Sequence, residues 1–155
     1  MKEIKLTKGF ITQVDDEDYE YLNQFKWSFY KSGNIYYVQR KKTIKGKRYG
    51  IKIHRIIMNT PNKMVVDHID HNGLNNQKSN LRNCLRYENM RNRRSSASSG
   101  FLGVHLSRNK YIIAHINING KNIHLGMFKT KESAALAYNK AAIKYFGKFA
   151  NLNKI

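Results

Sequence analysis

The segment RNRRSSASSG, residues 91–100, most strongly constrains how this chain can fold. Its small polar side chains cannot contribute to a hydrophobic core, and such a composition is typical of a flexible joint. The chain has 155 residues, 41% of them hydrophobic, which suffices for one ordinary core or two small ones. We therefore predict a first domain over residues 1–94, a linker over 95–100 and a second domain over 101–155.

The first half of the sequence predicts a β-rich domain. NIYYVQRK and YGIKIHRIIM are rich in Tyr, Ile and Val, and the turn signals GN, KGK and NTPNK punctuate them, which is typical of β-hairpins. The acidic stretch DDEDYEYLNQFKW indicates a short surface helix or turn, capped by Asp15 or Asp16. We expect Phe10, Trp27 and Tyr30 to be core and packing residues.

The second half predicts a small antiparallel sheet. In FLGVHLSRNKYIIAHINING, followed by KNIHLGMFKT, apolar and polar residues alternate with period two, and Asn119-Gly120 is a hairpin turn signal. We therefore expect three strands over about 103–107, 110–118 and 122–128.

A helix is predicted after these strands, in TKESAALAYNKAAIKYFGK. Thr130 can cap its first turn, and Gly147 follows as the residue after its end. One face at helical spacing carries Ala134, Tyr138, Ala141 and Tyr145. So many alanines let the helix backbone lie close to a sheet, and we predict that the second half packs three antiparallel strands on this helix. With its β-rich first half, the whole chain is predicted to be an α+β protein.

The charge of the chain predicts a polyanionic partner. The net charge of +19 divides into +5 over residues 1–50, +6 over 51–100 and +8 over 101–155, so it is not confined to a tail. A basic field of this extent attracts nucleic acid, and we expect double-stranded DNA. No apolar run reaches the 18 residues of a membrane span, and we expect no membrane association. A single cysteine, Cys84, fits a reducing compartment, so a cytoplasmic location is expected.

The stretch VVDHIDHNGLNNQKSNLRNCLRYENMRNR, residues 65–93, carries the candidate chemistry. Val65-Val66 predict a buried strand that ends in Asp67 and His68, and a second strand and a helix from about Arg86 complete a β-β-α unit. Carboxylate and amide oxygens suit a hydrated Mg²⁺-class ion, and a neutral histidine beside them can take a proton from water. Together these groups predict hydrolytic cleavage of a phosphodiester backbone.

This stretch resembles the HNH endonucleases, in the subgroup of phage and intron-encoded homing enzymes, and LTKGFITQVDDEDYEYLNQFKW and IKIHRIIM extend the resemblance over residues 1–93. The resemblance implies that His68 is the general base, and that Asp67 and Asn89 hold a single divalent metal ion. It also implies that Asn80 orients the histidine or supports its loop. The third motif position is asparagine, Asn89, rather than histidine, which favours Mg²⁺ or Mn²⁺ over zinc.

Residues 101–152 resemble the APETALA2-like (ethylene-response-factor) DNA-binding domain, through LG-x-F, AA-x-AY-x-x-AA and a final Ala-x-Leu-Asn. That resemblance implies that the outer sheet face lies in the DNA major groove. The plant domains carry arginine and tryptophan there, whereas the corresponding positions here are His105, Ser107, Tyr111, His115, Asn117, Asn122 and His124. In the first half, Arg82 and Arg93 are expected to add DNA contacts.

Several alternatives stay open from the sequence. His54, His68, His71 and Cys84 offer the residue types of a structural zinc site, although their spacing matches no compact zinc pattern, and His54 is better explained as a structural, hydrogen-bonded residue. A second minor alternative is a metal site on the three histidines of the sheet face. The alternative function is a non-enzymatic DNA-binding protein or transcription regulator with an inactive nuclease half. One metal site favours a monomer that nicks one strand, and a dimer is the alternative.

Overall fold

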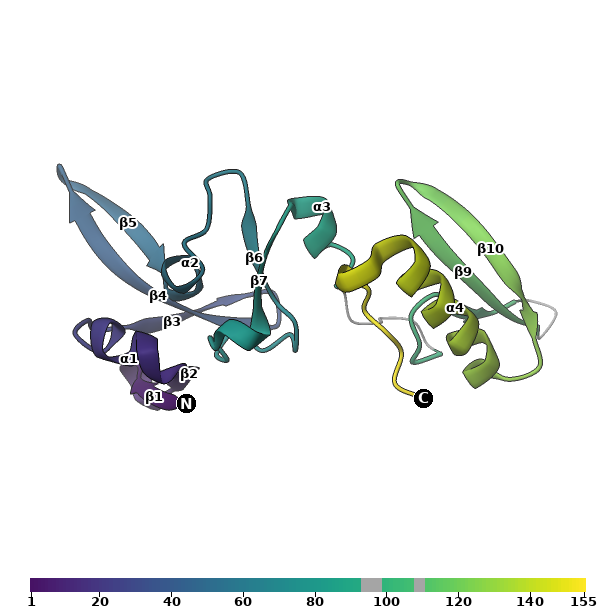
Figure 1. Cartoon of the computed structure of the whole chain (residues 1–155), viewed down its shortest axis with the longest axis horizontal. Helices are drawn as coiled ribbons and strands as arrows, with labels where there is room; N and C mark the ends of the chain where they lie inside the picture. Colours follow the sequence, from purple (N-terminus) through teal and green to yellow (C-terminus); the bar gives the residue numbers. More distant parts are fainter. Residues whose placement is uncertain (93–98, 108–110) are drawn as a thin grey trace. The chain divides into compact units, whose positions relative to one another are not determined.

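The computed structural model describes residues 1–92, 99–107 and 111–155, and the chain forms two compact units, Met1–Arg86 and Tyr87–Ile155 (Figure 1). Both units combine helices with antiparallel sheets, as predicted for an α+β protein. Most of the predicted linker, 95–98, lies outside the described residues, and the domain limits at 94 and 101 stay a prediction. None of the helices in the described part is both long and apolar enough to cross a bilayer.

The first unit contains three antiparallel sheets, formed by β1 with β2, by β3 with β4 and β5, and by β6 with β7. Its elements in chain order are β1 (Lys2–Lys5), β2 (Ile11–Val14), α1 (Asp16–Leu22), β3 (Ser28–Ser32), β4 (Ile35–Ile44), β5 (Lys47–Lys52), α2 (Ile53–Ile57), β6 (Val65–His68) and β7 (Leu81–Cys84). The predicted hairpins are present. The segment IHRII is a helix rather than a strand, because short apolar runs do not distinguish the two and this one packs Ile53, Ile56 and Ile57 into or against the core.

The core of the first unit gathers β1, β2, α1, β4 and α2 around Trp27. The Trp27 ring is buried, and its Nε1 donates to the Leu22 carbonyl at 2.8 Å, so the end of α1 is tied to the start of β3. Phe10 packs against this core, as predicted. Tyr30 lies at the periphery and stacks on Tyr37, with ring centroids 5.6 Å apart.

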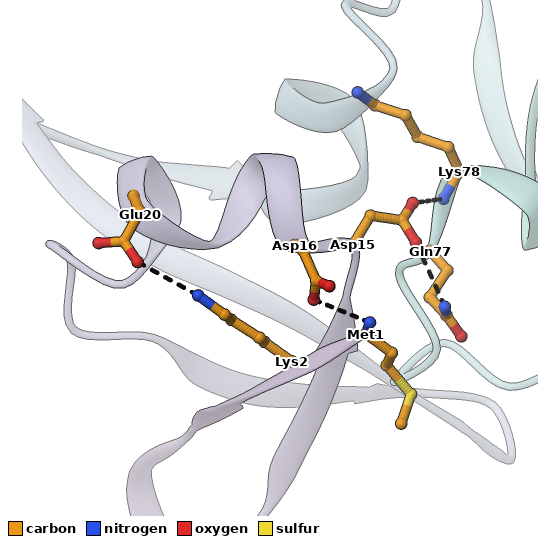
Figure 2. Close-up of polar contacts among 7 residues, drawn as sticks. All are labelled: Met1, Lys2, Asp15, Asp16, Glu20, Gln77 and Lys78. Atoms are coloured by element: carbon orange, nitrogen blue, oxygen red, sulfur yellow. Dashed lines mark hydrogen bonds and ion pairs between the residues drawn. The ribbon is translucent and has the colours of Figure 1, made fainter.

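Asp15 occupies the N-cap position of α1, but its carboxylate makes no hydrogen bond to that helix. It accepts instead from the Lys78 backbone N–H at 2.7 Å and from Gln77 Nε2 at 3.2 Å (Figure 2). Gln77 is the N-cap residue of a 3-10 turn at Lys78–Asn80. Asp15 is therefore the N-cap residue of α1 by position, as predicted, but its carboxylate caps a turn 63 residues further along the chain instead of α1. Asp16 pairs with the Met1 amine at 2.8 Å.

The second unit packs one helix against a three-stranded antiparallel sheet, as predicted. The helix α3 (Arg86–Asn89) precedes the strands β8 (Val104–Leu106), β9 (Ile112–Ile118) and β10 (Lys121–Phe128), in the sheet order β10-β9-β8, and α4 (Lys131–Phe146) follows them. Thr130 caps α4 by accepting from the Ser133 N–H at 3.1 Å, and Gly147 ends the helix at a φ of 53°. Both caps confirm the prediction.

The buried face of α4 comprises Ala134, Ala135, Tyr138, Ala141, Ala142 and Phe146. Tyr145, predicted on this face, is 42% exposed, so that prediction is wrong. Phe146 fills the core in the last turn, while the Tyr145 ring lies under the Lys144 ammonium, 5.5 Å from its centroid. At the end of the helix the wholly apolar ring of Phe146 is buried in the core, whereas Tyr145 keeps its hydroxyl in water.

Candidate active site

Asp67 and His68 lie at the end of β6, where the antiparallel register pairs them with Arg82 and Leu81 of β7. Each of the two side chains is only 5% exposed. Val65 and Val66, predicted to be buried, are half-buried. The short β6–β7 pair therefore places both the Asp67 carboxylate and the His68 imidazole inside the first unit.

His68 packs among aromatic rings. Its ring centroid lies 5.6 Å from that of Tyr37 on β4 and 5.2 Å from that of His54 on α2, both edge to face. Burial lowers the pKa of His68, although the Asn76 hydrogen bond and the nearby Asp70 and Asp67 oppose that change. Burial also lowers the pKa of His54, to about 3, with His68 as a further cause. At neutral pH both rings are therefore uncharged.

His54 is buried, as expected of a structural histidine, but it is not hydrogen-bonded as predicted. Within the described residues its Nδ1 atom has no hydrogen-bond partner. Its structural contribution comes from packing against Tyr37 and His68.

The side chain of Asn76 fixes the orientation of His68. The Asn76 Oδ1 atom lies 3.2 Å from His68 Nε2, and its Nδ2 donates to Thr12 Oγ1 at 2.8 Å and to the Gly73 carbonyl at 3.3 Å. A carbonyl oxygen only accepts, so Nδ2 must face Gly73 and Oδ1 must face the histidine. His68 Nε2 is therefore the donor, and in the neutral ring the basic nitrogen is Nδ1.

Thr12 completes this buried chain of hydrogen bonds. Its hydroxyl donates to the Leu74 carbonyl at 2.7 Å, which leaves the oxygen lone pairs to accept from Asn76. The backbone of Gln13 brackets the same loop, donating to Leu74 O at 2.9 Å and accepting from Asn76 N at 2.8 Å. Strand β2 is thus hydrogen-bonded to the loop whose residue Asn76 contacts His68.

Sequence reasoning missed both Thr12 and Asn76. The alternation of Thr12 with Val14 in ITQV places the hydroxyl on the inward face, and a buried hydroxyl requires a partner. That signal indicates a hydrogen bond without identifying Asn76, which is 64 residues away.

The side chain of Asn80 is hydrogen-bonded within the loop that follows β6. Its Oδ1 accepts from the Asp70 backbone N–H at 3.0 Å, and its Nδ2 donates to Asp70 Oδ1 and to the Asn75 carbonyl, each at 2.9 Å. Asp70 also accepts from Asn72 N and Asn75 Nδ2, and these hydrogen bonds lower the pKa of its carboxyl against the opposing effect of burial. Of the two roles expected for Asn80, this geometry favours loop support.

Gly73 allows this loop to approach β4. A Cβ atom at this position would overlap the Tyr36 carbonyl and the Tyr37 ring. The absence of a side chain therefore lets the loop that carries Asn76 lie directly against the strand that carries Tyr37.

Asp67 is paired with a cation in the structure. Arg82 donates to Asp67 Oδ2 through Nη2 at 2.6 Å and through Nε at 2.8 Å. Two donors on a single oxygen fix the rotamer of a carboxylate in this part-buried setting. Asp67, expected as a metal ligand, and Arg82, expected as a DNA contact, are therefore bonded to each other.

Two predicted site residues, Asn89 and Arg93, lie outside the first unit. Asn89 is the last residue of α3, in the second unit, where its carbonyl accepts from Asn92 N at 3.2 Å. Arg93 lies outside the described residues. Among the described residues no three histidine, cysteine or acidic side chains are grouped as metal ligands, so any cation here would depend on amide, water or phosphate oxygens.

The outer face of the second unit's sheet brings together five of the seven residues predicted to contact DNA. His115 on β9 is opposite His124 on β10, and its Nδ1 lies 3.1 Å from His105 Nδ1. Asn117 Nδ2 donates to Asn122 Oδ1 at 3.1 Å. The other two, Ser107 and Tyr111, meet where the Ser107 N–H donates to the Tyr111 carbonyl at 2.8 Å.

Comparison with known proteins finds similarity over almost the whole chain. A protein of Acanthamoeba polyphaga mimivirus described as an uncharacterized HNH endonuclease is 36% identical to this chain over 150 residues, covering 96% of this chain and 77% of the viral protein. No protein-family model matches the chain. No solved structure matches it either. On the similarity to the viral protein, the chain belongs to the HNH endonuclease family.

Proposed function

We propose that this protein is a metal-dependent endonuclease that hydrolyses a phosphodiester bond of duplex DNA, with His68 as the general base. One observation carries the proposal: His68 is buried and hydrogen-bonded through Nε2 to Asn76, which makes Nδ1 of the neutral ring the proton acceptor. A histidine held in one tautomer is prepared to deprotonate water without reorganisation.

Asp67 and Asn89 would hold one Mg²⁺ or Mn²⁺ ion, which would neutralise charge on the scissile phosphate. The donor types fit such an ion, because one carboxylate and one amide oxygen suit a hard cation that keeps several waters. Arg82 fixes the Asp67 carboxylate from the neighbouring strand. Asn80 fixes the following loop through Asp70.

The outer sheet face of the second unit is proposed to bind duplex DNA. Its asparagine pair can bond to adenine edges, and its histidines can contact bases or phosphates. This surface would give the enzyme site preference of the homing type. One metal site in a monomer favours a nick, whereas a double-strand cut requires a dimer or a second binding event.

A supercoiled plasmid tests the proposal when it is incubated with the full chain in Mg²⁺, in Mn²⁺ and in excess chelator. We expect nicked circles with either metal and none with chelator. DNA binding without cleavage under every condition would contradict the proposal and support the non-enzymatic alternative.

A further inference from the structure

The far half of the β4–β5 hairpin forms a two-stranded ribbon without a third strand or a core. Strand β3 pairs with β4 only from Ile35 to Gln39, and the hairpin extends beyond it through the pairs from Arg40↔Ile51 to Ile44↔Lys47 (Figure 1). Every residue from 41 to 50 is exposed. An isolated two-stranded ribbon is only marginally stable in water. Core packing therefore does not explain why the hairpin extends so far beyond β3.

This basic ribbon, residues 40–52, carries cations and no acid. Its exposed cations are Lys41, Lys42, Lys45, Lys47, Arg48 and Lys52. No ion pair in the described part of the chain involves them, although Lys2 and Lys78 of the same unit are paired with acids. Across the strands, Lys41 is opposite Gly50 and Lys42 is opposite Tyr49, so neither has a neutralising partner there.

The cations lie on both faces of the ribbon. Cross-strand pairs alternate between faces, so Lys42 and Lys47 lie on one face while Lys41 and Arg48 lie on the other. A cationic surface on one side only would suit a flat anionic partner. Cations on both sides suit a groove with phosphates on both walls, and the major groove of B-DNA, about 12 Å wide, admits a two-stranded ribbon.

The base of the ribbon is at the candidate active site. Tyr37 on β4 contacts the His68 ring, and β5 runs directly into α2, whose His54 contacts the same ring. From Tyr37 to the turn at Lys45 is eight residues, or about 26 Å at roughly 3.3 Å per residue. That length corresponds to about 8 base pairs of DNA, at roughly 3.4 Å per pair.

We propose that the basic ribbon lies in the major groove of the substrate, within about 8 base pairs of the bond that is cut. The proposal rests on the proposed function, since it names a DNA-binding surface of the same enzyme. The ribbon would anchor the catalytic unit itself, in addition to any contact made by the second unit.

The test compares two triple variants of the full chain with the same loss of charge. The ribbon variant is Lys41→Gln, Lys42→Gln and Arg48→Gln, and the matched control is Lys5→Gln, Lys26→Gln and Lys63→Gln, all exposed positions of the same unit. Duplex affinity is measured against salt. We expect the slope of log K against log salt to fall by up to about 2.7 in the ribbon variant, at roughly 0.9 per lost phosphate contact, and to change little in the control.

A probe locates the ribbon directly. Thr43→Cys carrying an iron-EDTA group is expected to cut the backbone within about 8 base pairs of the nick, whereas Lys26→Cys, at an exposed position outside β6 and the ribbon, gives no such cluster when it carries the same group. Equal slopes for the two triple variants, or no clustered cuts from position 43, would overturn the ribbon proposal. If unmodified protein neither binds nor nicks DNA, the proposed function itself fails. Nicking with equal slopes rejects the ribbon alone.

Discussion

The Nε2 atom of His68 lies 3.2 Å from Oδ1 of Asn76, and both side chains are buried. Asn76 cannot reverse its amide without turning Oδ1 toward the Gly73 carbonyl, so the bond sets the histidine tautomer. Thr12 secures the amide from the other side. Thr12 on β2 and the Gly73 carbonyl together hold the amide that sets which nitrogen of the candidate base is basic.

Thr12→Val tests this control, because valine has the same shape and no hydroxyl. We expect a second His68 tautomer to appear in ¹⁵N NMR spectra. Nicking should slow by between about 10-fold and the roughly 10⁴-fold cost of a wrong histidine tautomer in serine proteases. The buried Asn76 amide loses a partner, so unfolding free energy should fall by about 1–3 kcal/mol. Thr12→Ser keeps the hydroxyl and is expected to retain the native tautomer; an Nε2–H ring in Thr12→Val would argue against this role.

His68→Ala removes the candidate base itself. Nicking is expected to slow by roughly 10²–10⁴-fold, the usual contribution of a general base. The side chain is neutral, so duplex affinity should hardly change. Single-turnover nicking and a binding titration at one salt concentration measure the two quantities separately. A wild-type rate in this variant would rule out the assignment.

Asp67→Asn is expected to act through the cation. Loss of the anionic oxygen weakens a hard-ion site, so half-maximal nicking should require more Mg²⁺ or Mn²⁺. Asp70→Asn is the comparison, because Asp70 already accepts three hydrogen bonds within its loop. A metal titration that shifts in Asp70→Asn and stays fixed in Asp67→Asn would move the ligand to Asp70.

Asp15→Ala should destabilise the first unit, because Asp15 joins the start of α1 to the turn before β7 (Figure 2). Two hydrogen bonds to a half-buried carboxylate are lost, and we expect about 1–2 kcal/mol less unfolding free energy. Asp16→Ala is the matched control, since its partner is the exposed Met1 amine and its removal should change stability little. Urea unfolding of both variants gives the comparison, and equal stability would show that the Asp15 contacts contribute nothing.

Local patterns predicted what depends on neighbouring residues. The alternation in β9 and the alanine spacing of α4 each repeat over several residues, and the caps at Thr130 and Gly147 are set by the adjacent turn. The same patterns failed for α2, whose five residues are too few to show a helical period.

The polar network around His68 could not be predicted in the same way. Asp15 meets Lys78 and Thr12 meets Asn76 across more than 60 residues, and no local period encodes such partners. The motif predicted Asp67 and His68 as candidate site residues from their adjacent positions in the sequence. It could not show that Arg82 pairs with Asp67, because that contact depends on the register of β6 against β7.

The two halves should separate in function. A fragment of residues 99–155 keeps the bond from Ser99 Oγ to the Val104 carbonyl and those from Asn153 to Leu102 and Asn139, so it should fold around α4. Residues 101–155 carry nine Lys and Arg against one acid, Glu132, so the fragment should bind duplex DNA without cutting it. Its log K should fall by about 0.9 per log unit of salt for each phosphate neutralised.

The complementary fragment of residues 1–94 keeps Asp67, His68 and Asn89 as well as the basic ribbon, so it should still nick DNA with weaker binding and poorer site selection. Nicking assays on matched and scrambled duplexes, with circular dichroism to verify folding, compare it with the full chain. If residues 1–94 bind and select a site as well as the full chain does, the sheet of the second unit is not a DNA anchor. If a folded 99–155 fragment binds no duplex at low salt, its positive charge serves only to keep that surface solvated.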